Sequence, residues 1–164
     1  MSSLAIEYRG QGLCVASWGA LVIYVWSGPI TAPLIEVSAQ ARSQALARTD
    51  GIGSVLHIHV ARRVPRPDEA LRRRARDVMA HFAPNTIGQV HVIEGAGFAG
   101  SAMRSLIEST RSDAPLLITT SIDDALDWLA ELDDQDPMLE VYRDQLCDDV
   151  RQLTASVVAS LTAA

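Results

Sequence analysis

Apolar and polar residues along this chain fall into short alternating runs, separated by runs with helical spacing. The alternation predicts six strands, and spacing of three and four residues predicts helices between the later ones. The predicted strands cover residues 4–9, 13–18, 20–28, 54–60, 87–93 and 115–121. The predicted helices cover residues 33–48, 68–82 and 122–132, and one more begins at a glycine-rich turn near residue 100.

The order of these elements is β-β-β-α-β-α-β-α-β-α. Strands that alternate with helices over short connections are typical of a mostly parallel sheet with right-handed crossovers. We therefore predict an α/β domain over residues 1–132. Residues 133–137, rich in Asp and ending in Pro137, are expected to form a linker, and residues 138–164 a C-terminal amphipathic helix.

The C-terminal helix has an apolar seam close to a heptad repeat. Two interpretations stay open: the helix packs back on its own domain, or it forms a dimer through residues that include Tyr142, Leu146 and Leu153. The seam comprises Leu139, Tyr142, Leu146, Val150, Leu153, Val157 and Leu161.

Composition supports a folded domain, because 48% of the residues are hydrophobic and 21% are charged. Cys14 and Cys147 give neither a disulfide framework nor a C-x-x-C pair, which suits a reducing compartment. The N-terminal residues lack the pattern of a signal peptide. The longest apolar stretch, residues 13–26, is shorter than the roughly 20 residues that span a bilayer. We expect a cytoplasmic protein without membrane insertion.

Charge is unevenly distributed along the chain. Through residue 111 there are 12 Arg against 8 acidic residues, and after it 2 Arg against 12 acidic residues. Nucleic acid is not expected as the partner, since the chain carries a net charge of −6 and no DNA-binding motif. Two interpretations of the basic segment remain. It forms a solvated face, or it binds an acidic protein surface, which could be residues 123–149 of this chain. The basic segment contains Arg62, Arg63, Arg66, Arg72, Arg73, Arg74 and Arg76.

A G-x-G-x-x-G motif formed by Gly95, Gly97 and Gly100 connects a predicted strand to a predicted helix. A dinucleotide fold would also need an acidic residue at the end of the next strand, but residues 118–121 carry no charge. The glycines instead suit a tight turn. Free amides at the helix N-terminus beside Ser101 give a second hypothesis, a site for a phosphate or another anion.

Three histidines are predicted on one face of the sheet. His57 and His59 alternate on one strand, and His91 lies on its expected neighbour. Two interpretations follow: a zinc site, or a mixed sheet face that is partly wet or covered by the C-terminal helix or a second subunit. No Ser or Cys has a histidine at a spacing that would indicate a nucleophile with its base. We therefore expect neither a catalytic site nor a cofactor.

The segments VASWGALVIYVWSGPIT, GAGFAGSAMRSLIES and ITTSIDDALDWLAE, together with the element order, resemble the STAS family of anti-anti-sigma-factor-like domains, in a divergent bacterial branch. The resemblance covers about residues 4–132. It implies a mixed four- or five-stranded sheet with helices mainly on one face, and regulation by protein binding. Phospho-switch members carry Ser or Thr after the strand equivalent to residues 54–60, whereas residues 61–70 have no hydroxyl here. A phospho-switch would have to use Ser101, Thr119, Thr120 or Ser121.

Two functions are thus predicted. The first is a non-enzymatic regulatory or scaffolding module that binds a protein partner or itself. The alternative is a small-ligand sensor that binds a phosphate, nucleotide or lipid headgroup at residues 95–101.

Overall fold

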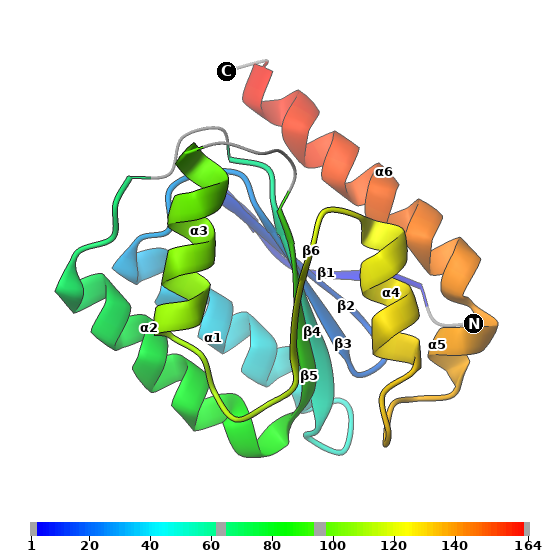
Figure 1. Cartoon of the computed structure of the whole chain (residues 1–164). Helices are drawn as coiled ribbons and strands as arrows, with labels where there is room; N and C mark the ends of the chain where they lie inside the picture. The colour runs from blue at the N-terminus through cyan, green and yellow to red at the C-terminus, as the bar shows by residue number, and fades with distance from the viewer. Residues whose placement is uncertain (1–2, 62–64, 94–97, 163–164) are drawn as a thin grey trace.

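The structure is a computed structural model, and it describes residues 3–61, 65–93 and 98–162. A single six-stranded sheet crosses the molecule, with helices on both of its faces (Figure 1). The strands are β1 Ala5–Gly10, β2 Leu13–Trp18, β3 Leu21–Trp26, β4 Gly53–His59, β5 Thr86–Ile93 and β6 Leu116–Thr119. The helices are α1 Ala32–Leu46, α2 Glu69–Phe82, the 3-10 turn η1 Ala83–Asn85, α3 Phe98–Ser109, α4 Ile122–Ala130, α5 Met138–Val141 and α6 Arg143–Thr162.

The strands lie in the sheet in their order along the chain, from β1 to β6. β1, β2 and β3 form an antiparallel meander, and β3, β4, β5 and β6 run parallel to one another. The predicted α/β class and the predicted order of elements are confirmed.

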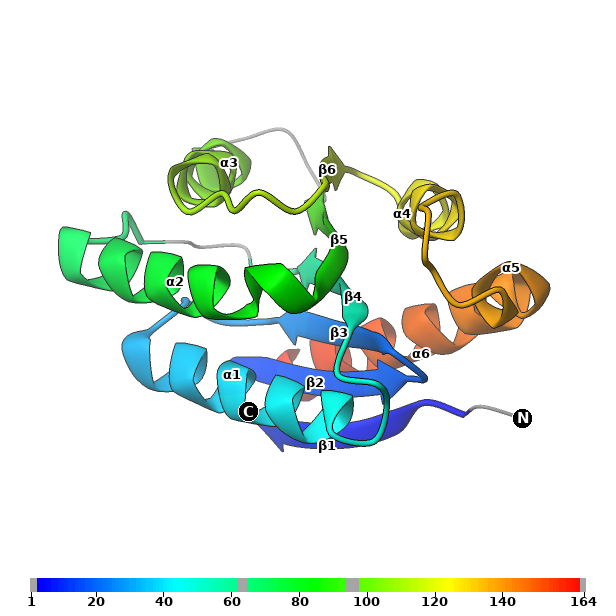
Figure 2. The same cartoon turned by 90° about the horizontal axis from the view of Figure 1, so that it is seen from below.

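Helices α1, α2 and α3 cover one face of the sheet, and α4, α5 and α6 cover the other (Figure 2). The implied four or five strands and the implied placement of the helices mainly on one face are therefore wrong. The reason lies in the second sheet face. Apart from Ser54, which bonds to Gln135, it carries mainly apolar side chains on the central strands, and helices α4 to α6 bury them. This face includes Ala16, Ile23, Val25, Leu56, Ile58, Val90 and Val92.

The C-terminal helix packs on its own domain. Tyr142 separates it into α5 and α6, and both helices place their apolar side chains against the sheet. Leu146 is fully buried and Leu153 is 8% exposed, while Tyr142 is half-buried with its ring edge-on to Trp18. Most of the apolar seam is thus buried within the chain, as the first of the two interpretations predicts, while Leu161 at its end is 46% exposed.

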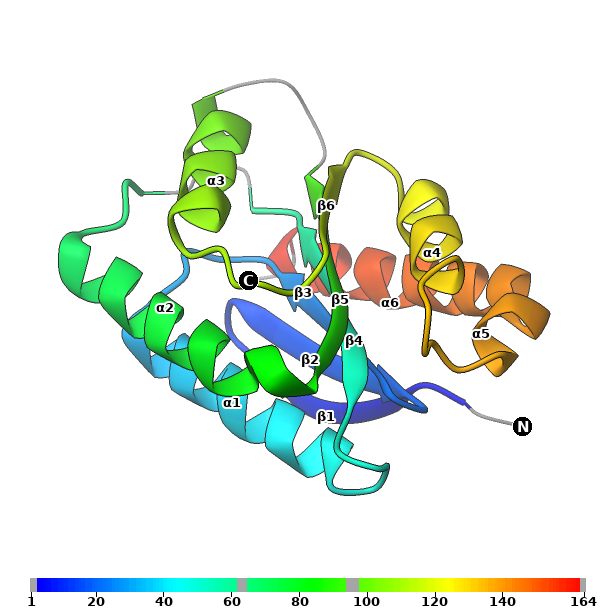
Figure 3. The same ribbon diagram turned by 60° about the horizontal axis from the view of Figure 1, so that its bottom comes forward.

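Residues 133–137 form a turn that is tied to the domain. Ser54 donates a hydrogen bond to the Gln135 side chain over 2.5 Å, and the Asp136 carboxylate accepts from the backbone amide of Met138 over 2.9 Å. The turn places α5 beside α4 (Figure 3).

Gly53 begins β4 where the chain passes very close to the end of the β2–β3 hairpin. A Cβ atom there would lie 2.0 Å from the carbonyl oxygen of Ala20, which also accepts a hydrogen bond from the Ser54 amide. We expect Gly53→Ala to lower the free energy of unfolding by about 3 kcal/mol, because the nearest obstructing atom belongs to the backbone of Ala20 and has little room to move. Urea unfolding tests this, with the half-exposed neighbour Ile52→Ala as a control expected to change stability by about 0.5 kcal/mol or less. Equal stability of Gly53→Ala and the parent chain would contradict the close approach.

Candidate functional site

Histidine side chains form a stack on the sheet face that α1, α2 and α3 cover. His57 of β4 is paired in register with Tyr24 of β3 on one side and with His91 of β5 on the other. The His57 ring stacks on the His91 ring at a centroid distance of 4.3 Å and on the Tyr24 ring at 4.7 Å. His59 lies two residues further along β4 on the same face. The prediction that the three histidines share one face is confirmed.

Hydrogen bonds connect these rings to Trp26 and Gln89. The indole Nε1 of Trp26 donates to Nδ1 of His57 over 3.1 Å. Nε2 of His59 and Nδ1 of His91 are 3.0 Å apart, and Nε2 of His91 lies 2.5 Å from the Gln89 amide nitrogen. The Nδ1 atom of His59 is buried and has no hydrogen-bond partner among the described residues.

Burial keeps all three histidines neutral. Desolvation lowers the pKa of His59 to about 3. Desolvation also holds the pKa values of His57 and His91 well below the ordinary value. Repulsion adds to this effect, from His59 and Arg42 on His57 and from the other two histidines on His91. These rings act at neutral pH as hydrogen-bond donors and acceptors, not as charges.

The stacking also decides against the zinc interpretation. The His57 and His91 planes differ by 3° and the His59 and His91 planes by 8°, so the rings lie nearly parallel. A tetrahedral metal needs lone pairs that converge on one point, whereas four of the six ring nitrogens here are engaged in hydrogen bonds with Trp26, Gln89 or another ring of the stack. Within the described residues, no group of three or more His, Cys, Asp or Glu side chains is suited to a metal ion.

A cavity of about 90 Å³ lies between this stack and the three helices. Its polar lining is His57, His59, His91, Gln89, Ser38 and Thr110, and the remainder is aromatic or aliphatic. The apolar lining comes from Trp26, Ile30, Ile35, Ala75, Val78, Met79, Met103, Leu106 and Ile107. His57 lies beneath the helices but keeps accessible surface, which is consistent with its place in the cavity wall.

Helix α2 is the loosest wall of the cavity. The sequence predicts an apolar face of Leu71, Ala75, Val78, Met79 and Phe82, yet only Phe82 is buried and the other four are half-buried. An amphipathic helix on a globular domain usually buries this face against the core. Here the face lies partly over empty space.

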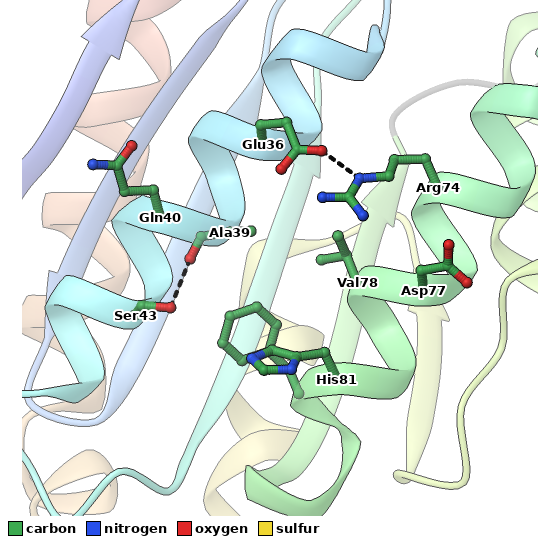
Figure 4. Close-up of a pocket in the computed structure, with 9 residues that line it drawn as sticks. Glu36, Ala39, Gln40, Ser43, Arg74, Asp77, Val78 and His81 are labelled. Atoms are coloured by element: carbon green, nitrogen blue, oxygen red, sulfur yellow. Dashed lines mark hydrogen bonds and ion pairs between the residues drawn. The ribbon is translucent and has the colours of Figure 1, made fainter.

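A surface groove of about 550 Å³ runs between α1 and α2 (Figure 4). Glu36 and Arg74 form an ion pair across it, and the Val78 side chain points into it. Among the described residues, Val78 is the one that lines both the groove and the cavity.

Arg42 of α1 is a buried cation outside the cavity lining, with 4% of its surface exposed. Its Nη2 donates to the Thr86 hydroxyl over 2.6 Å and its guanidinium lies 4.4 Å above the Phe82 ring. Its Nε has no hydrogen-bond partner, and no carboxylate among the described residues pairs with it. Its positive charge contributes to the lowered pKa of His57.

The predicted basic surface is partly neutralised by neighbouring carboxylates. Arg74 pairs with Glu36, and Arg76 pairs with Glu69 over 2.7 Å. Arg66 and Arg73 are exposed, Arg72 is half-buried with an unpartnered Nε, and Arg62 and Arg63 lie outside the described residues.

No ion pair joins the acidic segment to this basic surface in the part of the chain that the structure describes. Segment 123–149 covers the opposite face of the sheet, where its carboxylates pair with the arginines of α6 (Figure 2). Asp123, Asp127 and Asp144 surround Arg143, and Asp123 and Asp148 contact Arg151.

The predicted anion site is described only in part. Gly95 and Gly97 lie outside the described residues, while Gly100 is buried in the first turn of α3 and Ser101 is exposed. The hypothesis of a phosphate site at residues 95–101 therefore stays a prediction.

Ser38, which lines the cavity, and the buried Arg42 were not among the sequence candidates. A signal for both exists in the sequence: Ser38 and Arg42 occupy the apolar face of α1, one turn apart, between Ile35 and Ala45. A charged residue at a core-facing position is rarely buried without a partner, which marks such positions as candidates.

The chain matches no family model, no curated protein and no solved structure. Among the described residues, no helix is both long enough and apolar enough to cross a membrane. The assignment of a function therefore rests on the site itself.

Proposed function

We propose that this domain is a regulatory module that binds a small, largely apolar molecule in the cavity beneath α2. The observation that carries the proposal is the half-buried apolar face of α2 above a cavity whose opposite wall is the histidine stack. A mostly apolar enclosure with a few convergent polar groups is the usual form of a small-molecule site.

The location supports this proposal. Trp26, His59 and His91 lie at or near the carboxyl ends of the parallel strands β3, β4 and β5. Ligands of open α/β sheets commonly bind outside this end of the strands. The ligand would enter from the α1–α2 groove by displacement of Val78.

The lowered pKa values of the histidines fit a site that binds a ligand without catalysing a reaction. A general acid or base works best with a pKa near the operating pH, whereas burial lowers the pKa of His59 to about 3. The polar groups of the cavity are therefore suited to orienting a ligand.

Xenon, a probe of apolar cavities, tests the proposal on the full chain. We expect xenon to shift the amide resonances of β4, β5 and α2 in NMR spectra. Ala75→Leu should abolish these shifts and raise the melting temperature by a few degrees, because the larger side chain fills the cavity. Ala80→Leu, an exposed position on the same helix, is the matched control. Xenon shifts that are absent from the parent chain, or that survive in Ala75→Leu, would contradict the proposal.

A STAS-like protein-interaction module remains the second proposal. Its support is the element order through α4 and the placement of α1, α2 and α3 on one face. Within the basic segment 62–76, the exposed Arg66 and Arg73 are the described arginines without an ion pair that remain available to an acidic partner. Cytoplasmic location and self-association remain predictions.

A further inference from the structure

The hydrogen bonds of the histidine stack define which ring nitrogens carry protons. The indole nitrogen of Trp26 can only donate, so Nδ1 of His57 accepts and, in the neutral ring, Nε2 carries the proton. No hydrogen bond of this Nε2–H occurs among the described residues. His57 therefore supplies one free donor in the wall of the cavity.

A second donor follows from the chain of contacts that starts at Gln89. The Gln89 amide nitrogen donates to Nε2 of His91, so His91 carries its proton on Nδ1 and donates it to Nε2 of His59. His59 then carries its own proton on Nδ1. This atom is the one that is buried without a partner, in a residue that is 6% exposed and lines the cavity.

Leaving such groups unpaired is costly. A buried donor without an acceptor loses its hydrogen bonds to water without replacement, and a buried charge without a counterion loses still more hydration. Arg42, whose charge acts on His57, is in the second situation. Acceptor oxygens on a ligand would satisfy the two histidine donors, and a negative charge on it would be attracted by Arg42, which does not itself line the cavity.

We propose that the ligand of this cavity is a small aliphatic carboxylate, whose oxygens accept hydrogen bonds from His57 Nε2–H and His59 Nδ1–H within the field of Arg42. The inference rests on the proposed function, because it names the ligand class of the same cavity. The apolar lining from α2 and α3 would surround the aliphatic part. Compared with a 150 Å³ cavity that holds benzene, the space takes about four non-hydrogen atoms, and more if Val78 moves.

Acetate, acetone and isopropylamine, which match in heavy-atom count, separate the alternatives. In NMR titrations of the full chain at neutral pH and constant ionic strength, we expect acetate to bind about tenfold more tightly than acetone, and isopropylamine not to bind. His59→Phe should weaken acetate binding about tenfold while xenon still binds. Arg42→Met, the second variant, should reduce the preference for acetate over acetone to about twofold. His81→Phe, on the exposed side of α2, should change nothing.

The outcomes distinguish this inference from the proposed function. Equal binding of acetate and acetone would overturn the inference that the ligand is a carboxylate. A preference for isopropylamine would also overturn it, because the hydrogen bonds that start at Gln89 would then run in the opposite direction. Xenon binding without binding of any of the three compounds would overturn the inference and leave the proposed function standing. The proposed function itself fails if xenon does not bind either.

Discussion

A chain ending at residue 136 will not fold. Without α5 and α6, one face of the sheet loses the side chains of Leu139, Leu146, Cys147, Val150, Leu153 and Val157, each between 0% and 8% exposed in the full chain. At about 1.5–3 kcal/mol for each buried side chain, the loss is of the order of 10 kcal/mol. Whole domains are stable by only about 5–15 kcal/mol. We expect the truncated chain to lack dispersed NMR resonances and a cooperative thermal transition.

A point substitution tests the same contact within the full chain. Leu146→Ala should lower the free energy of unfolding by about 2–5 kcal/mol, because the fully buried side chain leaves a cavity. Val158→Ala, at a 38% exposed position of the same helix, should cost about 0.5 kcal/mol or less. If residues 1–136 fold with an unchanged melting temperature, the packing of α6 on its own sheet is wrong. The interpretation that the C-terminal helix forms a dimer would then be favoured.

Acid will unfold the domain at a pH where its carboxylates are still largely ionised. In the unfolded chain His57, His59 and His91 take up protons near pH 6.5, whereas in the folded chain burial lowers the pKa of His59 to about 3 and those of the other two well below the ordinary value. Between these limits the unfolded state binds more protons. The free energy of unfolding therefore falls as pH falls, by up to about 1.4 kcal/mol per pH unit for each histidine.

Urea unfolding between pH 7 and pH 5 measures this slope. The three histidines together account for up to about 4 kcal/mol per pH unit, which is large against the stability of a domain. His59→Phe should remove about a third of the slope, and the surface variant His81→Gln should leave it unchanged. A slope near zero in the parent chain, or one that His59→Phe does not reduce, would mean that these rings are not buried in the neutral form.

Local patterns in the sequence were sufficient for the order of elements and for several helix ends. Asp68 and Ser121 precede α2 and α4, and each side chain accepts a hydrogen bond from a backbone amide of the first turn, as their residue types predict. The period of two along β4 placed His57 and His59 on one face. These features depend on residues close together in the chain.

The partners of each face could not be predicted, because periodicity shows which side chains share a face but not what covers it. The histidine face was expected to be partly wet or covered by the C-terminal helix or a second subunit, and α1, α2 and α3 cover it instead. The apolar seam of α6 suits its own sheet as well as a second helix. The cavity has no local signal either, since it arises where α2 spans the sheet without burying Val78 and Met79.

A crystal structure of the full chain, grown at neutral pH in acetate, tests the cavity most directly. We predict an open space between α2 and the sheet that holds the carboxylate, with its oxygens within hydrogen-bond distance of Nε2 of His57 and Nδ1 of His59. A cavity closed by direct packing of Val78 and Met79 on the histidine rings would contradict the account.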